Sequence, residues 1–231
     1  MGRAKEIIVK VIPSKIANVF VKKNHYSGKV ANNSSLHFGC FLDNKLHGVM
    51  SYGSPLDKSK VLPLVNSCNK TKNAKWNEML ELNRMAFDEY LPKYSESRCI
   101  SISVKLLKKN APQIKWILSF ADGTQCGDGT IYRASGFVLT SIKENTSVII
   151  LEDGSIASRI TYQKGKHILK SKGKAIAPKT SINMKGSQLR YIYLIDKSCK
   201  ITVPILPFSE IDKQGAGMYK GEKISLEDRR K

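Results

Sequence analysis

A glycine-rich segment near the middle of the chain, residues 119–137, holds two side chains that could do chemistry. Its sequence is SFADGTQCGDGTIYRASGF. Asp122 could act as a general base toward an amine, or as an oxygen ligand of a metal ion. Tyr132 could donate a proton or bind an anionic leaving group, while the glycines allow close approach of a substrate to the backbone. A solvated turn is the competing interpretation, since Asp-Gly is a common turn dipeptide.

The segment YSESRCIS, residues 94–101, predicts the start of a helix. A helix N-terminus presents free N–H groups and a partial positive charge, which suit a pyrophosphate. Ser95, Ser97 and Arg98 would add donors to such a site. An ordinary helix capped by Ser95 or Ser97 fits the same spacing, so both interpretations stay open.

Three further side chains stand where a substrate could reach them. His25 and Tyr26 belong to NHYSGK, beside a flexible turn, and the imidazole could shuttle protons or bind a metal. Arg84 lies within the apolar stretch LELNRMAF, where a charged group needs a partner or a pocket. It could pair with Glu81 or Asp88, or it could face a bound anion.

The elements that must position these residues alternate between strands and helices. We expect strands near 5–13 and 80–87, helices near 14–26 and 94–111, a hairpin over 36–53 and an exposed loop over 55–76. The short apolar stretch 113–122 predicts a buried strand, followed by a short helix up to Gly136 and more strands. This order predicts an α/β fold with a mixed sheet flanked by helices.

The charge of the chain indicates a polyanionic partner. Lys and Arg number 39 against 19 for Asp and Glu, which gives a net charge of +20 and a pI near 9.8. A basic, β-rich C-terminal extension with a loosely ordered tail is expected over 158–231, after a catalytic domain over 1–157. Its lysines and tyrosines suit contact with DNA phosphates and bases. The stretch QLRYIYLID could equally be a plain strand whose tyrosines pack in the core.

Several classes of protein and site are disfavoured by what the sequence lacks. It contains no P-loop, Rossmann fingerprint, HExxH or Gly-x-Ser-x-Gly motif, and its five cysteines form no CxxC pair. No signal peptide and no apolar stretch of membrane-spanning length is found. We therefore expect no membrane association and a location in the cytoplasm.

The blocks NHYSGK, ELNRMAF, YSESR and SFADGTQCGDGTIYRASGF occur in an order that resembles the Mom family of phage DNA-modification proteins. The same order resembles the GNAT-type N-acetyltransferase fold, in which a helix start receives the pyrophosphate of coenzyme A. The usual glycine-rich pyrophosphate loop is absent here, and Ser95 to Arg98 stand in its place. The resemblance covers roughly residues 5–160.

This resemblance implies an enzyme that modifies N6 of adenine in double-stranded phage DNA with a carbamoylmethyl group, inside the bacterial host, as protection against restriction. It implies acetyl-CoA or a related donor, and possible Fe(II) binding. The catalytic positions carried over are Asp122, Tyr132, Arg84, Ser97, His25 and Tyr26. Ser95, Ser97 and Arg98 would bind the cofactor, and His25, Tyr26, Asp122 and Tyr132 are the candidate metal ligands.

The implied mechanism begins with a base flipped out of the duplex, because N6 is inaccessible inside it. Asp122 would help to deprotonate N6, Tyr132 would assist the leaving thiolate, and lysines from 158 onward would hold the DNA backbone. Two other functions fit the sequence: an N-acetyltransferase for a protein or small amine, and a non-enzymatic basic DNA-binding protein.

Overall fold

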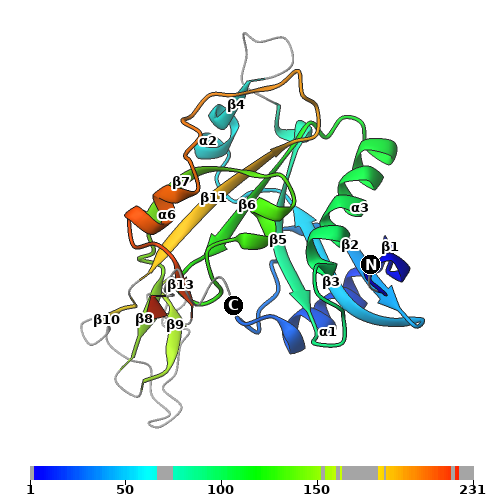
Figure 1. The fold of residues 1–231 in the computed structure, drawn as a ribbon, viewed down its shortest axis with the longest axis horizontal. Helices are drawn as coiled ribbons and strands as arrows, with labels where there is room; N and C mark the ends of the chain where they lie inside the picture. Colours follow the sequence, from blue (N-terminus) through cyan, green and yellow to red (C-terminus); the bar gives the residue numbers. More distant parts are fainter. Residues whose placement is uncertain are drawn as a thin grey trace. The chain divides into compact units, whose positions relative to one another are not determined.

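A seven-stranded mixed sheet forms the centre of the fold in the computed structural model (Figure 1). The structure describes residues 3–66, 75–151, 154–159, 162, 182–184, 186–219 and 222–223. The strands, in their order across the sheet, are β1 (Ile8–Val11), β2 (Ser34–Leu42), β3 (Lys45–Gly53), β5 (Met79–Phe87), β6 (Trp116–Asp122), β11 (Ser187–Leu194) and β7 (Val138–Glu144). The predicted α/β class and mixed sheet are confirmed.

The β2–β3 hairpin has the geometry that its sequence predicts. Asp43 and Asn44 both have positive φ, 49° and 61°, as a two-residue type I′ turn requires. Asn and Asp tolerate this region better than most residues, so the turn fixes the register of the two strands. Phe41 and Leu46 pair across it.

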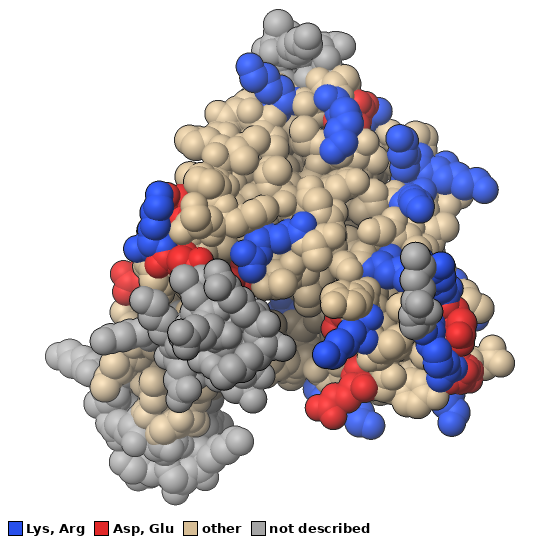
Figure 2. All heavy atoms as spheres, viewed as in Figure 1, with Lys and Arg blue, Asp and Glu red and all other residues tan. Residues whose placement is uncertain are grey.

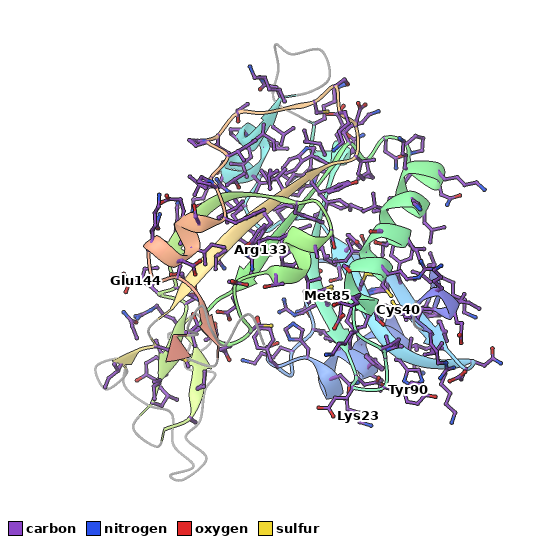
Figure 3. The ribbon with its side chains drawn as sticks, in the orientation of Figure 1. Lys23, Cys40, Met85, Tyr90, Arg133 and Glu144 are labelled. Atoms are coloured by element: carbon purple, nitrogen blue, oxygen red, sulfur yellow. The ribbon has the colours of Figure 1, made fainter. Side chains whose placement is uncertain are left out.

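Two helices cover opposite faces of the sheet. Helix α1 (Ser14–Asn24) packs its buried Ala17 and Val21 against Val49 of β3 and Ala86 of β5. Helix α3 (Ser95–Asn110) contacts the other face of β3, because strand residues alternate in direction, and there the Tyr52 hydroxyl bonds the Ser103 hydroxyl at 2.7 Å. We name the two surfaces the α1 face and the α3 face. Cys40, a free thiol in hydrogen-bond contact with the Cys99 thiol, lies on the α3 face (Figure 3).

The prediction of an exposed loop over 55–76 is wrong for its first part. Residues 58–66 form helix α2 (Lys58–Val61), the 3-10 turn η2 (Leu62–Leu64) and strand β4 (Val65–Asn66), which pairs with β12 (Lys200–Ile201). Their apolar side chains enter a core cluster with Trp116 and Ile192. The hydrophobic effect thus determines the placement of a segment that its turn-forming residues had suggested to be exposed. Residues 67–74 lie outside the described part.

The chain divides into two compact units at positions other than the predicted boundary at 157/158. One unit comprises Met1–Phe120, Thr130–Ser141 and Arg190–Pro207; the other comprises Ala121–Gly129, Ile142–Leu189 and Phe208–Lys231. The boundary differs because β11, from the predicted extension, pairs within the central sheet. Tyr191 is fully buried there, as the plain-strand interpretation predicts.

The second unit contains its own small sheet. Strands β10 (Ile182–Asn183), β8 (Val148–Ile150) and β9 (Ile156–Ser158) are antiparallel, and Ile149, Leu151, Ala157 and Tyr162 form the core beneath them. Helix α6 (Ser209–Lys213) and the strand pair β13 (Met218–Tyr219) and β14 (Glu222–Lys223) follow later in the chain. Six of the predicted DNA-binding lysines, those between 163 and 181, lie outside the described residues. In the described segments, no helix has the length and apolar character needed to cross a membrane.

Candidate functional site

The site is built around a place where two parallel strands stop pairing. Strands β5 and β6 are paired from Met79 and Trp116 up to Leu82 and Ser119, and the Ser119 hydroxyl donates to the Leu82 carbonyl at 3.0 Å. Both strands continue beyond these residues without further pairing to each other, so among the described residues the backbone groups on that edge of β5 lack a strand partner. We call this place the strand fork. Parting strands expose N–H and C=O groups that can bind an extended ligand.

A β-bulge on β5 coincides with the strand fork. The register with β3 shifts from Ser51 opposite Arg84 to Tyr52 opposite Leu82, which leaves Asn83 as an extra residue. Bulges redirect side chains and are frequent next to active sites. The side-chain oxygen Oδ1 of Asn83 accepts a bond from the Ser34 hydroxyl at 2.7 Å, whereas its side-chain nitrogen Nδ2 is buried with no hydrogen-bond partner among the described residues. An unused buried donor is costly unless a ligand satisfies it.

The bulge also brings two charged residues to the same face. In a regular strand, side chains three residues apart point to opposite faces. Here Glu81 lies opposite Gly53, and Arg84 lies opposite Ser51, so both side chains are on the α1 face. Neither predicted ion pair of Arg84 is present: within the described segments it makes no contact with Glu81 or Asp88 of ion-pair length, and Asp88 instead bonds His47 at 2.9 Å.

Arg84 fixes the segment that crosses this face. Its Nε donates to the Lys29 carbonyl at 2.9 Å, and its Nη1 donates to the Asn83 carbonyl at 2.5 Å. The guanidinium therefore ties the chain after α1 to the bulge.

His25 is held as a neutral hydrogen-bond donor beside Arg84. The Ser27 backbone N–H donates to His25 Nδ1 at 3.2 Å, and the Ser27 hydroxyl lies 2.8 Å from the same nitrogen, an arrangement that favours the neutral ring with its proton on Nε2. Burial first, and then the charge of Arg84, lower the pKa of His25 to about 4. The Tyr26 ring lies 4.2 Å from the imidazole, centroid to centroid, and is 48% exposed. Together they offer one N–H donor and one open aromatic surface.

The predicted metal ligands do not fit a metal site. No group of three or more His, Cys, Asp or Glu side chains with suitable geometry occurs among the residues that the structure describes. Metal binding at Nε2 of His25 would require the other tautomer, which loses the bond from the Ser27 amide. The carboxylate of Asp122 is engaged by other donors, as described below. We derive no chemical step through iron.

Glu81 is a carboxyl group whose importance the sequence does not reveal. Burial raises the pKa of Glu81 to about 7, and the positive charge of Arg84 only partly opposes this increase. From sequence it is a possible ion-pair partner of Arg84; an acidic residue inside an apolar strand is the only signal it gives. Its environment becomes evident only from the register of β5 with its neighbours.

The start of α3 has unused amides but no side-chain cap. Tyr94 precedes it in the left-handed region, φ 70°. The Ser95 and Ser97 hydroxyls donate to the carbonyls of Pro92 and Tyr94, so the predicted capping by these serines is wrong. Arg98 donates to the Lys5 carbonyl at 3.0 Å. Within the described residues, the N–H groups of positions 96 and 97 have no acceptor, and such groups can bind an anion.

Asp122 holds the glycine-rich loop of the second unit. Its Oδ1 accepts bonds from the Thr124 N–H and the Asn145 side-chain amide, both at 3.0 Å, and its Oδ2 accepts one from Gln125 at 3.3 Å. Thr124 and Asn145 are buried. The residue is thus the centre of an ordered turn and not a solvated one. These bonds leave its carboxylate less available as a base.

Replacement of Asp122 by alanine tests this role. The Thr124 amide and the Asn145 side chain would lose their acceptor, so we expect the free energy of unfolding to fall by about 2 kcal/mol. Asp57→Ala is a matched control, because Asp57 also accepts from a backbone N–H but is half exposed. Urea denaturation of both variants gives the comparison, and equal stability of Asp122→Ala and wild type would contradict the structural role.

Tyr132 is a packed residue of the first unit. It lies in α4 (Thr130–Ala134), is 9% exposed, and its ring centroid is 5.4 Å from Phe137 and 5.3 Å from Tyr191. Gly136 ends the helix with φ 82°, as predicted. Asp122 belongs to the second unit and Tyr132 to the first. The structure brings together His25, Tyr26, Glu81, Asn83 and Arg84 around the bulge.

Comparison with known proteins agrees with the sequence blocks. The model of the Mom protein family matches residues 6–210. Methylcarbamoylase mom of Escherichia phage Mu is 32% identical over 205 residues, which cover 85% of this chain and 79% of that protein. A Bacillus subtilis acetyltransferase solved in complex with CoA matches 81% of this chain and 98% of its own, with 8% identity and a TM-score of 0.45. An IAA acetyltransferase from Bacillus cereus matches 81% and 99%, with 11% identity and the same TM-score. The predicted relationship is confirmed, and the chain belongs to the Mom protein family.

Proposed function

We propose that this protein transfers a carbamoylmethyl-type group to N6 of adenine in double-stranded phage DNA, so that host restriction enzymes no longer cut it. The observation that carries the proposal is the coincidence of the strand fork, the bulge at Asn83 and a high-pKa carboxyl group at Glu81. A site for group transfer needs a place for an extended donor next to a proton acceptor. The name of the phage Mu relative, methylcarbamoylase, supports the choice of this reaction class.

On the donor side, a coenzyme A thioester alone would give an N6-acyl adenine, so the carbamoylmethyl product requires a donor whose methylene carbon carries the leaving group. The free amides at positions 96 and 97, with Ser95, Ser97 and Arg98 beside them, would hold the pyrophosphate of a coenzyme A donor. The unused amide of Asn83 and the unpaired edge of β5 would bind polar groups of its extended arm. Glu96 in the first turn of α3 helps the helix dipole but opposes an anion, so the site is of modest strength.

On the acceptor side, a flipped adenine needs a surface to stack on and a partner for its ring nitrogens. We assign the stacking surface to the exposed ring of Tyr26, and the hydrogen bond to a ring nitrogen to Nε2–H of His25. Asp122 is assigned to hold the glycine-rich loop rather than to deprotonate N6, because its oxygens already accept bonds. Tyr132 supports α4 through its aromatic neighbours.

Helix α1 offers a basic surface close to this acceptor side. It contains Lys15, Lys22 and Lys23 and no acidic residue, and Lys29 follows it. Lys23 projects from the end of the helix (Figure 3). Lys and Arg side chains are spread over the face shown in Figure 2, with Asp and Glu between some of them. We assign phosphate contacts to the α1 lysines in addition to those expected from 158 onward.

Charge reversal on α1 tests this surface. We expect Lys22→Glu with Lys23→Glu to weaken duplex binding at low salt about tenfold or more. The slope of log affinity against log salt should also show about two fewer counterions released on binding. Lys108→Glu with Lys109→Glu is the matched control, since these residues are also adjacent, helical and exposed. Fluorescence anisotropy over a salt series measures both. Equal losses in the two double variants would mean that DNA is not localised at α1.

The reaction itself is tested by expression of the protein in a bacterial host. Host DNA is digested to nucleosides, and the mass of each adenine nucleoside is measured. We expect a deoxyadenosine species whose added mass equals that of the carbamoylmethyl group. An added acetyl mass would instead support plain acetyl transfer, and unchanged adenine in the presence of soluble protein would contradict the proposed function.

A further inference from the structure

We propose that Glu81 is the catalytic base, the group that accepts the proton lost by N6 of adenine as its new bond to carbon forms. This assignment rests on the proposed function and names a residue within it. It is carried by the position of the carboxyl group, by its lack of protein partners and by the segment that covers it.

Glu81 stands directly before the point where the sheet opens. It is opposite Leu118 in the parallel ladder with β6, and the following rung, Leu82 with Ser119, is the last. Across the other ladder it faces Gly53. The carboxyl group is thus the last acidic group on the α1 face before the strand fork.

The stretch between α1 and β2, residues 25–33, covers part of the α1 face, and we call it the covering segment. It shields this carboxyl group from bulk water without closing it off from a ligand. A side chain at Gly53 would overlap the backbone of Asn33, with the carbonyl carbon only 2.7 Å from the added Cβ. The chain between α1 and β2 therefore passes over Gly53, the register partner of Glu81 on β3. Glu81 itself is partly, not fully, buried. Shielding removes bulk water from the carboxylate while it leaves an approach for a ligand.

Two other carboxylates, at the opposite end of the β3–β5 pair, have their oxygens filled. Asp88 bonds His47 and the Tyr90 amide, and Asp43 bonds Arg3 and the Tyr90 hydroxyl. Within the segments that the structure describes, Glu81 makes no hydrogen bond and no ion pair. Its oxygens are available to accept a proton from a bound amine.

The electrostatic surroundings suit a base at neutral pH. Burial raises the pKa of Glu81 to about 7, and Arg84 on the same strand opposes that rise. Of the groups on neighbouring elements, His25 is neutral at this pH, and the register partner on β6, Leu118, carries no charge. Tyr52 of β3 is directed to the α3 face. A base is most effective when its pKa is close to the working pH.

The step balances without a further reactant. The N6 lone pair forms the new N–C bond to the methylene carbon of a carbamoylmethyl donor, while the bond from that carbon to the donor's leaving group breaks. The leaving group departs with that electron pair, and the N6 proton moves to a carboxylate oxygen of Glu81. The protonated carboxyl group can return this proton to the leaving group.

The experiment compares wild type with Glu81→Gln, Glu81→Asp and the exposed-surface control Glu144→Gln. Lysates that contain each protein, and therefore the natural donor, receive duplex DNA in buffers from pH 5.5 to 8.5. The rate of formation of modified adenine is measured by nucleoside mass. Duplex affinity of each purified variant is measured by anisotropy, and CoA affinity by calorimetry.

We expect Glu81→Gln to slow modification about 100-fold or more while both affinities stay within about twofold. The wild-type rate should rise with pH with a midpoint near 7, and the residual rate of Glu81→Gln should lack this rise. Glu81→Asp should keep the rise at a reduced rate. Glu144→Gln should match wild type.

Two results would overturn the assignment while the proposed function stands: a Glu81→Gln rate near that of wild type with the same midpoint, or a loss of rate matched by a loss of both affinities. If wild type modifies no adenine in cells or in lysate, the proposed function fails, and the role of Glu81 fails with it.

Discussion

Replacement of Gly53 by alanine is expected to destabilise the protein by about 3 kcal/mol and to abolish modification of adenine. The new Cβ would lie 2.7 Å from both the carbonyl carbon of Asn33 and the Cα of Ser34, and closer still to the Asn33 oxygen. These are backbone atoms, so the segment after α1 would have to move away from β3. That segment carries His25 and the Lys29 carbonyl that Arg84 holds.

Gly39→Ala is the matched control for this prediction. Gly39 also lies within a strand of the sheet, but an added Cβ there meets only side-chain atoms of Phe41, Ile12 and Leu46, at 2.8–3.0 Å. Side chains can adjust where backbone cannot, so we expect a smaller loss, about 1 kcal/mol. Urea denaturation and nucleoside analysis measure both variants. Equal stability of the two would show that the covering segment is free to shift.

Local patterns were sufficient to predict the elements that position the site. The Asp43-Asn44 turn, the amphipathic helix after Pro13 and the continuous apolar stretch of β6 each satisfy a rule that depends on neighbouring residues alone. Helix α3 was located correctly, although the geometry of its first turn was not. Its serines bond backward to carbonyls, a choice set by the left-handed Tyr94 that no spacing rule indicates.

The bulge could not be predicted, because it depends on how two strands align. Regular alternation would put Glu81 and Arg84 on opposite faces, and only the extra residue at Asn83 places them together. Sequence blocks could therefore select Arg84 as a site residue and still miss its partner in function. The same blocks emphasised Asp122, whose surroundings emerge only when Asn145, far along the chain, folds back to bond it.

The segment that contains Val61, Leu64 and Val65 shows a related limit. Prolines, serines and lysines around these residues are typical of an exposed loop. Their burial depends on β12, more than a hundred residues later, which pairs with β4 and helps to cover the cluster around Trp116. Long-range pairing of two-residue strands leaves no periodic signal to find.

Glu81→Gln is expected to make the protein more stable above neutral pH even as it slows the reaction. The pKa of Glu81 is raised in the fold from its ordinary 4.5 to about 7, so its contribution to stability is fully present below pH 4.5 and is lost as pH rises to about 7. Glutamine is uncharged throughout and avoids this loss. After allowance for partial exposure, we expect the variant to gain about 2 kcal/mol at pH 8 and almost nothing at pH 4.5.

His25 changes stability with pH in the opposite direction, and it does so equally in wild type and in Glu81→Gln. Its pKa is lowered in the fold from 6.5 to about 4, so both wild type and Glu81→Gln should lose stability as pH falls through that interval. The difference between their unfolding free energies therefore isolates the carboxyl group. Denaturation curves from pH 4.5 to 8.5 should give a difference that grows to a plateau near pH 7. A pH-independent difference would show that Glu81 is not held in the shielded state from which we infer its role as a base.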